Sequence, residues 1–155
     1  MRWTIVAFGK LKEAHWQAAA AEYLKRLGPY RPVSVTELAD ERVSAGEEGR
    51  AVAREGERLL AHVGPEAYLV ALTEDGEQLG SEALSGRLAL LDLEPHAGIV
   101  FAIGGANGLA PAVLARARWR LGLSRLTLPH QLARVLLCEQ LYRAERIRRK
   151  EPYHK

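Results

Sequence analysis

The chain has little cysteine and no long apolar run, and each scarcity excludes a class of protein. Its 155 residues include one cysteine, Cys138, which excludes an internal disulfide and a metal site built on several cysteines. No apolar stretch approaches the roughly 20 residues of a membrane span. The N-terminal MRWTIVAFGKLKE lacks the long apolar region and cleavage site of a secretion signal. We therefore expect a soluble, cytoplasmic protein with no membrane partner.

Charge is distributed unevenly along a chain whose length predicts one domain, residues 1–155. From Pro111 onward there are eleven basic and three acidic residues, a net +8. Because the whole chain carries +3, residues 1–110 must carry −5. Such asymmetry favours a polyanionic partner, which for a cytoplasmic protein is most often nucleic acid. The alternative is a solvated basic helix end that is stabilised by the helix dipole.

Short apolar runs alternate with helix-like segments along the whole chain. Strands are predicted at residues 3–8, 33–38, 68–72, 98–103 and 119–123, and helices at 13–27, 45–62, 81–93, from 111, and 129–149. Ser81 is positioned to cap the third helix. Such alternation predicts an α/β fold with a mainly parallel sheet and helices on both faces. The segment 98–103 is the most continuously apolar, so we expect it at the centre of the sheet.

A glycine-rich turn, Gly104-Gly105-Ala106-Asn107-Gly108, follows this central strand. Glycines allow a ligand to approach the backbone closely, and ligands of open α/β sheets bind beyond the carboxyl ends of the strands. No Gly-Lys-Ser/Thr follows, so the turn is not a P-loop, and its GGxxG spacing fits a dinucleotide fingerprint poorly. A purely structural turn is the alternative.

The segment 121–130 alternates apolar and hydroxyl residues before the last helix. Its backbone could hydrogen-bond a flat heterocycle while leucines pack on the faces of that ring. The alternative is that Ser124 or Thr127 caps the helix and that His130 is a structural hydrogen-bonding residue. No two histidines have metal-ligand spacing, so we predict no metal.

The predicted last helix is apolar on two sides. Leu136, Ile147, Ala133, Ala144 and Leu137 form one apolar face, and Val135 and Tyr142 lie beyond the polar stripe. A helix of this kind is buried on two sides, so we expect one side to pack on its own sheet and the other on a second subunit.

The polar stripe of this helix and the tail after it carry groups suited to chemistry. Glu139 and Arg143 are spaced as a helical ion pair, which is either solvated or leaves the arginine free to bind a phosphate. The chain ends Pro152-Tyr153-His154-Lys155. Terminal segments usually fray, so a phenol and an imidazole there indicate a site if the tail is held in place.

These segments together resemble the SPOUT-type methyltransferases, and among them the RlmH-type 23S ribosomal RNA pseudouridine N3-methyltransferases. The resemblance covers the whole chain. It depends on the strand 3–9, Leu72 with Gly76, the segment 103–109, and above all LTLPHQLARVLLCEQLYRA and the terminal PYHK. It implies a C-terminal trefoil knot, a homodimer, and S-adenosylmethionine as methyl donor without a metal.

The resemblance also implies roles for individual residues. The donor would contact three loops, represented here by Leu72, Gly104, Leu123, Ser124, Arg125, Leu126, Thr127 and Leu128. The acceptor, N3 of a pseudouridine in 23S rRNA on assembled ribosomes, would meet His154 as general base and Tyr153 as its assistant or as a stacking surface. Phosphates would be held by Arg143, Arg148, Arg149 and Lys150.

Two positions depart from the family pattern. Thr73 stands where the family usually has Asp, and Glu145 stands where relatives tend to have an aromatic residue. The first departure affects an expected polar contact to the donor, and the second affects the expected dimer face or RNA face. The alternatives to this function are a non-catalytic ribosome-associated RNA-binding factor and a SPOUT methyltransferase that acts on tRNA.

Overall fold

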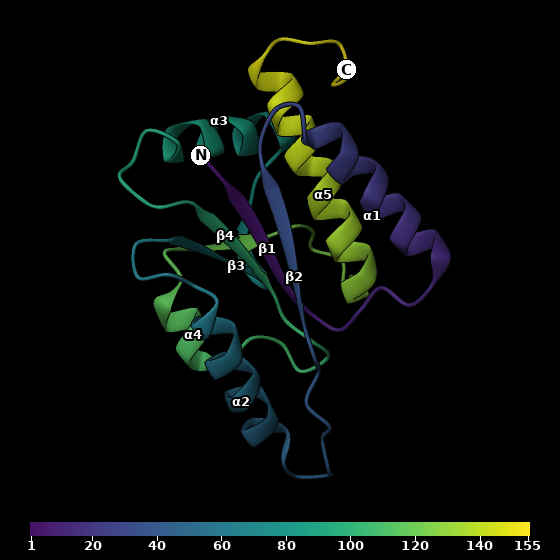
Figure 1. Ribbon diagram of the computed structural model, residues 1–155, viewed down its shortest axis with the longest axis vertical. Helices are drawn as coiled ribbons and strands as arrows, with labels where there is room; N and C mark the ends of the chain where they lie inside the picture. Colours follow the sequence, from purple (N-terminus) through teal and green to yellow (C-terminus); the bar gives the residue numbers. More distant parts are fainter.

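One parallel sheet organises the protein. The computed structural model describes all 155 residues (Figure 1). Its elements are β1 (Trp3–Phe8), α1 (Ala14–Leu27), β2 (Val33–Leu38), α2 (Glu48–Ala61), β3 (Tyr68–Gln78), α3 (Ser81–Leu91), β4 (Ile99–Ile103), α4 (Pro111–Arg116), β5 (Trp119–Gly122) and α5 (His130–Arg148). The strand order is β2-β1-β4-β3-β5, and every neighbouring pair is parallel. The predicted α/β class and the central position of the 98–103 strand are confirmed.

Helices cover both faces of this sheet, because alternate strand residues enter separate cores. Trp3, Ile5 and Ala7 pack with side chains of α1, α3 and α5. Val6 and Phe8 pack with side chains of α2 and α4 on the opposite face. Figure 1 shows α2 and α4 together on one side of the strands and α1, α3 and α5 on the other. None of the helices has the length and apolar character of a membrane span.

Strand β3 differs from its prediction as a short strand that ends at Leu72. It continues to Gln78, and its pairing with β5 is interrupted between Leu72 and Glu77, which both pair with Leu121. Residues 73–76 therefore bulge out of the ladder. In a bulge, strand pairing continues on either side of the inserted residues. The strand therefore does not end at Glu74-Asp75-Gly76, although these residue types favour a turn.

The prediction that Ser81 caps α3 was wrong. Gly80 occupies the cap position, and the Ser81 hydroxyl instead donates to Oε1 of Gln140 on α5 at 2.7 Å. This hydrogen bond is a tertiary contact between α3 and α5, which local sequence does not reveal.

Helix α5 packs on α1 and α3. Its buried residues are Arg134, Leu137, Cys138, Leu141, Tyr142, Ala144 and Glu145. They include Leu137, Ala144 and Tyr142 from the predicted apolar sides, whereas Leu136 and Ile147 are partly exposed in the single chain. Arg134 and Glu145 are buried as well, because ion pairs compensate their charges. Contact of the other side with a second subunit stays a prediction. The trefoil knot at this end of the chain stays a prediction.

Candidate active site

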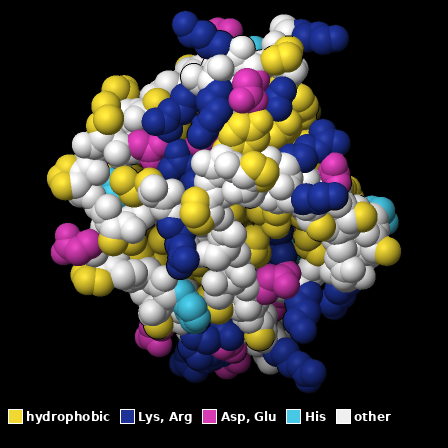
Figure 2. Space-filling model, turned by 45° about the horizontal axis from the view of Figure 1, so that its top comes forward, with side chains coloured by type: hydrophobic (Ala, Val, Ile, Leu, Met, Phe, Trp, Pro, Cys, Tyr) yellow, Lys and Arg dark blue, Asp and Glu magenta, His cyan; other side chains and the backbone are white.

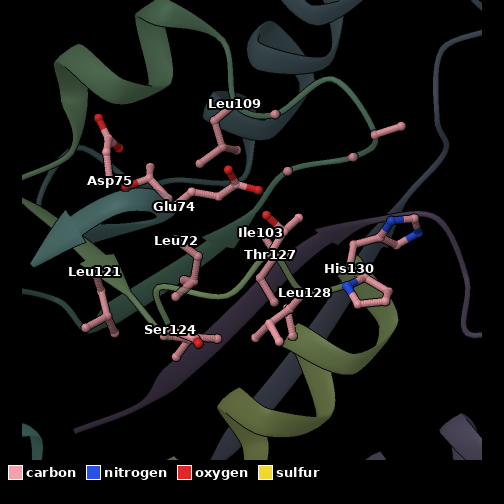
Figure 3. A pocket seen from close by; sticks show the side chains of 18 of the residues that line it. Leu72, Glu74, Asp75, Ile103, Leu109, Leu121, Ser124, Thr127, Leu128 and His130 are labelled. Atoms are coloured by element: carbon pink, nitrogen blue, oxygen red, sulfur yellow. The ribbon is translucent and has the colours of Figure 1, made fainter. Parts of the chain in front are cut away.

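A cavity lies where the bulge of β3 and the carboxyl ends of β4 and β5 meet the loop before α5 (Figure 3). Its volume is about 560 Å³, within the range of small-molecule sites. The lining residues come from 72–75, 103–109 and 121–130, with Leu114 and Ala133. Ligands of parallel α/β sheets bind at this edge, so the cavity is the candidate ligand site.

The bulge of β3 supplies one wall of the cavity. Thr73, Glu74 and Asp75 line it, and Gly76 returns the chain to the sheet. A Cβ on Gly76 would lie 2.5 Å from the backbone of Leu121 and of Gly122. Only glycine fits at this contact, so the bulge depends on the absence of a side chain at position 76.

The glycine-rich turn after β4 supplies a second wall. Gly108 has a φ of +77° and donates its N–H to the carbonyl of Gly105 at 3.1 Å. A Cβ on Gly104 would lie 2.7 Å from the carbonyl carbon of Gly108. The turn is therefore folded against itself, and its backbone is exposed to the cavity without covering side chains.

The loop between β5 and α5 supplies the third wall. Leu123, Ser124, Leu126, Thr127 and Leu128 line the cavity. The prediction that Ser124 or Thr127 caps α5 was wrong, because the helix begins after Pro129 without a side-chain cap. The Ser124 hydroxyl instead accepts a hydrogen bond from the Leu126 N–H at 2.9 Å, which stabilises the loop's own turn.

The structure brings together seven of the eight residues proposed to contact the donor. The exception is Arg125, which does not line the cavity. In Figure 3 the side chains of Leu72, Ile103, Thr127 and Leu128 converge on its centre. Sequence reasoning included Leu121 in a candidate ligand segment but did not assign Glu74 or Leu109, and all three line the cavity. The position of Leu109, directly after the glycine-rich turn that follows β4, was the available signal.

The cavity is mostly apolar, with few polar groups. Leucines dominate its walls, and the Oγ1 atom of Thr73 is buried without a hydrogen-bond partner. Buried hydroxyls are nearly always satisfied, so this atom is available to a ligand. Glu74 and Asp75 are the acidic lining residues, and no Lys or Arg lines the cavity.

The C-terminal tail is held against α5. The Tyr153 hydroxyl donates to Oε1 of Glu139 at 3.0 Å, and its ring contacts Tyr142 with centroids 4.8 Å apart. The Arg143 guanidinium lies 4.6 Å from the centroid of the Tyr153 ring, and its Nη1 is 3.2 Å from Nδ1 of His154. These contacts order a tail that would otherwise fray.

Ionisation of Tyr153 is suppressed. Burial and the hydrogen bond to Glu139 raise the pKa of Tyr153 to about 12. The phenol is therefore protonated at neutral pH, so it can donate a hydrogen bond but cannot act as a base.

Tail and cavity lie toward opposite ends of α5 within one chain. His130, the first residue of α5, lines the cavity, whereas the tail follows Arg148, the last. The tail folds back along the helix, and the Tyr153 hydroxyl contacts Glu139, nine positions and roughly 14 Å from His130 along the helix. Neither Tyr153 nor His154 is among the residues that line the cavity of the same chain.

The predicted phosphate-binding arginines are paired with carboxylates inside the chain. These ion pairs join Arg143 to Glu139, Arg148 to Asp92, and Arg149 to Glu145, whereas Lys150 is exposed. Figure 2 shows Lys and Arg side chains interspersed with Asp and Glu on one face of the molecule. A phosphate would have to compete with these carboxylates or bind beside them.

Glu145, which departs from the family pattern, belongs to a buried ion-pair network. Arg31 is 6% exposed and donates to Glu145 at 2.8 Å and to Asp92 at 2.5 Å. Burial opposes ionisation of Asp92, but hydrogen bonds from Arg31 and Arg148 outweigh it and hold the pKa of Asp92 below its ordinary value. Glu145 thus connects the end of α5 to the turn after α1 through an ion pair that an aromatic side chain could not form with Arg31.

Cys138 is a packing residue in the core. It is 1% exposed, and burial raises the pKa of its thiol to about 12. A thiol that stays protonated is a poor nucleophile. No group of three or more His, Cys, Asp or Glu side chains converges anywhere in the structure.

Comparison with known proteins identifies the family. The family model "Predicted SPOUT methyltransferase" matches residues 1–154. A protein of Bifidobacterium adolescentis named "Ribosomal RNA large subunit methyltransferase H" is 45% identical over the whole of both chains. A protein of the same name from Exiguobacterium sibiricum is 44% identical, again over the full length of both. The chain belongs to the SPOUT methyltransferase family.

Proposed function

We propose that the protein transfers a methyl group from S-adenosylmethionine to large-subunit ribosomal RNA, at N3 of a pseudouridine in 23S rRNA. The observation that carries the proposal is the cavity between the bulge of β3 and the ends of β4 and β5. The names of the full-length relatives support the rRNA substrate. The cytoplasm, where ribosomes are assembled, is the compartment that this proposal requires.

The residues of the cavity fit such a donor. Leucine side chains suit the faces of an adenine ring, and the exposed backbone of the turn at Gly104 suits its hydrogen-bonding edge. The unpartnered Thr73 hydroxyl can take part of the role of the Asp that is usual in the family. When bound, S-adenosylmethionine supplies a methyl group already activated by the sulfonium, so the chemistry requires no metal.

The protein must align the acceptor and assist loss of the N3 proton. Alignment of the two reactants alone can contribute several kcal/mol. We assign to His154 the role of general base that accepts the N3 proton, because an imidazole is suited to proton transfer near neutral pH. Tyr153, held protonated by burial and by Glu139, serves as a hydrogen-bond donor or a stacking surface.

This arrangement requires two copies of the chain. Because tail and cavity lie toward opposite ends of α5, the tail of one copy would complete the cavity of another in a homodimer. Leu132, Val135 and Leu136 of α5 are only partly buried, and they offer apolar surface for that contact. Lys150 and the arginines near the end of α5 would then lie beside bound RNA.

A single-turnover assay tests the proposal. Purified protein is incubated with radiolabelled donor and with ribosomes that lack the modification, and rRNA is analysed by mass spectrometry. We expect one added methyl on a pseudouridine of 23S rRNA. Label in tRNA instead would support the tRNA alternative, and no donor binding at tens of micromolar in calorimetry would support a non-catalytic RNA-binding factor.

Tail variants test the assignments of His154 and Tyr153. Deletion of residues 153–155 should abolish transfer while donor affinity changes by less than about twofold. His154→Gln should lower the rate of methyl transfer more than Tyr153→Phe does, with donor affinity unchanged in both variants. Full activity after the deletion would refute a role for the tail.

A further inference from the structure

The charge of the cavity is one-sided. Its charged carboxylates are Glu74 and Asp75, and no Lys or Arg is among its lining residues. The chain as a whole has a net charge of +3, so the sign of the cavity is opposite to that of the molecule. A ligand in this cavity therefore encounters negative side-chain charge in mostly apolar surroundings.

Glu74 and Asp75 differ in where they point. In Figure 3 the Glu74 side chain extends into the cavity toward Leu109 and Ile103, whereas the Asp75 carboxylate points away from Leu72 and Leu128. Glu74 forms no hydrogen bond or ion pair within the chain, although many other acidic side chains do. The bulge of β3 thus places an unpaired carboxylate where a ligand binds.

We propose that Glu74 is a specificity residue that favours a ligand carrying a sulfonium over the neutral thioether left when the methyl is lost. The inference rests on the proposed function, because it takes S-adenosylmethionine as the ligand. The two forms differ by one positive charge and one methyl group. A carboxylate in the cavity attracts the charged form, and it has no comparable attraction for the product.

The consequence is a bias toward product release. A partly exposed charge pair at a few ångströms changes a binding constant by about three- to tenfold. S-adenosylhomocysteine would otherwise keep nearly all the contacts of the donor and would inhibit by competition. The negative wall lowers its affinity relative to that of the donor, so Glu74 acts on the exchange of product for donor.

Calorimetry on the full-length protein tests the inference without any turnover. Three ligands are titrated: S-adenosylmethionine, S-adenosylhomocysteine, and sinefungin, which carries a protonated amine in place of the sulfonium methyl. The quantity compared is the ratio of the affinity for a cationic ligand to the affinity for S-adenosylhomocysteine. We expect Glu74→Gln to reduce this ratio about three- to tenfold for both cationic ligands. Added salt should reduce the ratio of the wild-type protein.

Glu57→Gln is the matched control, since it removes the same carboxylate from an exposed position on α2 that does not line the cavity. It should change the ratio by less than about twofold. Equal losses of affinity for all three ligands in Glu74→Gln, or equal effects of the two substitutions, would overturn the inference. Failure of the wild-type protein to bind any of the three would instead refute the proposed function, on which the inference depends.

Discussion

Replacement of Gly104 by Ala tests the geometry of the donor cavity. The new Cβ would lie 2.7 Å from the carbonyl carbon of Gly108 and 3.0 Å from the Leu109 nitrogen. Ordinary contact begins at 3.4 Å, so the turn must move by about 0.7 Å. Both neighbours are backbone atoms, and a rotamer change cannot relieve the overlap.

The expected result follows from this displacement. A shift approaching 1 Å in a binding wall can cost about 100-fold in rate, so we expect kcat/KM to fall about 10- to 100-fold and donor affinity to weaken at least about tenfold. Overpacking costs about 1–3 kcal/mol, which lowers Tm by roughly 3–10 °C in a domain of this size. The far-UV circular dichroism spectrum should stay that of the wild type.

Gly86→Ala is the matched control. Gly86 lies in α3, and a Cβ there meets no atom within 4 Å. Alanine is favoured over glycine in a helix by about 0.8–1 kcal/mol, so this variant should raise Tm by about 2–4 °C and leave donor affinity unchanged. Wild-type donor affinity in Gly104→Ala would refute the assignment of this turn to the donor site.

Three further predictions concern the interior. Arg134→Met removes the donor to Glu37 (2.5 Å) and to the Gly9 carbonyl (2.8 Å). It should lower the free energy of unfolding, measured in urea, by about 2–3 kcal/mol. The control Arg50→Met, at an exposed site, should change that free energy by less than about 0.5 kcal/mol. Because the pKa of Asp92 is held below its unfolded value, the stability it contributes is present at neutral pH and is lost as pH falls through the folded pKa. Asp92→Asn should therefore flatten the decline in stability between pH 5 and 3, and an unchanged slope would contradict the network. Cys138, with a pKa of about 12, should react with a disulfide reagent at pH 8 only when the protein unfolds, and rapid reaction of the folded protein would show that the thiol is accessible.

Local sequence predicted most elements because their signals are short-range. Apolar runs indicate strands, and glycine and proline indicate where strands and helices end, whatever the rest of the chain does. All five predicted strands are present. The bulge in β3 was missed because it depends on a contact between Gly76 and the backbone at Gly122, 46 positions further along. The burial of Glu145 in α5 was not foreseen, because its partner Arg31 is 114 positions away in sequence.

Part of the candidate site was also predictable from sequence and part was not. Resemblance placed the donor residues in three loops, and the parallel sheet explains why these loops meet, since the carboxyl ends of neighbouring strands share one edge. The entry of Glu74 into the cavity and the absence of Arg125 from its lining could not be inferred, because side-chain direction in a bulge or an irregular loop follows no simple period.

The sequence by itself determined the α/β class, the strand at the centre of the sheet, the basic C-terminal part and the family resemblance, because periodicity, composition and motifs are properties of neighbouring residues. Only the tertiary structure decided that the tail is held against α5 and that three basic residues already have carboxylate partners. It also decided that tail and cavity of one chain lie toward opposite ends of a helix. Those facts depend on distances between segments far apart in sequence, which are set by packing on the sheet.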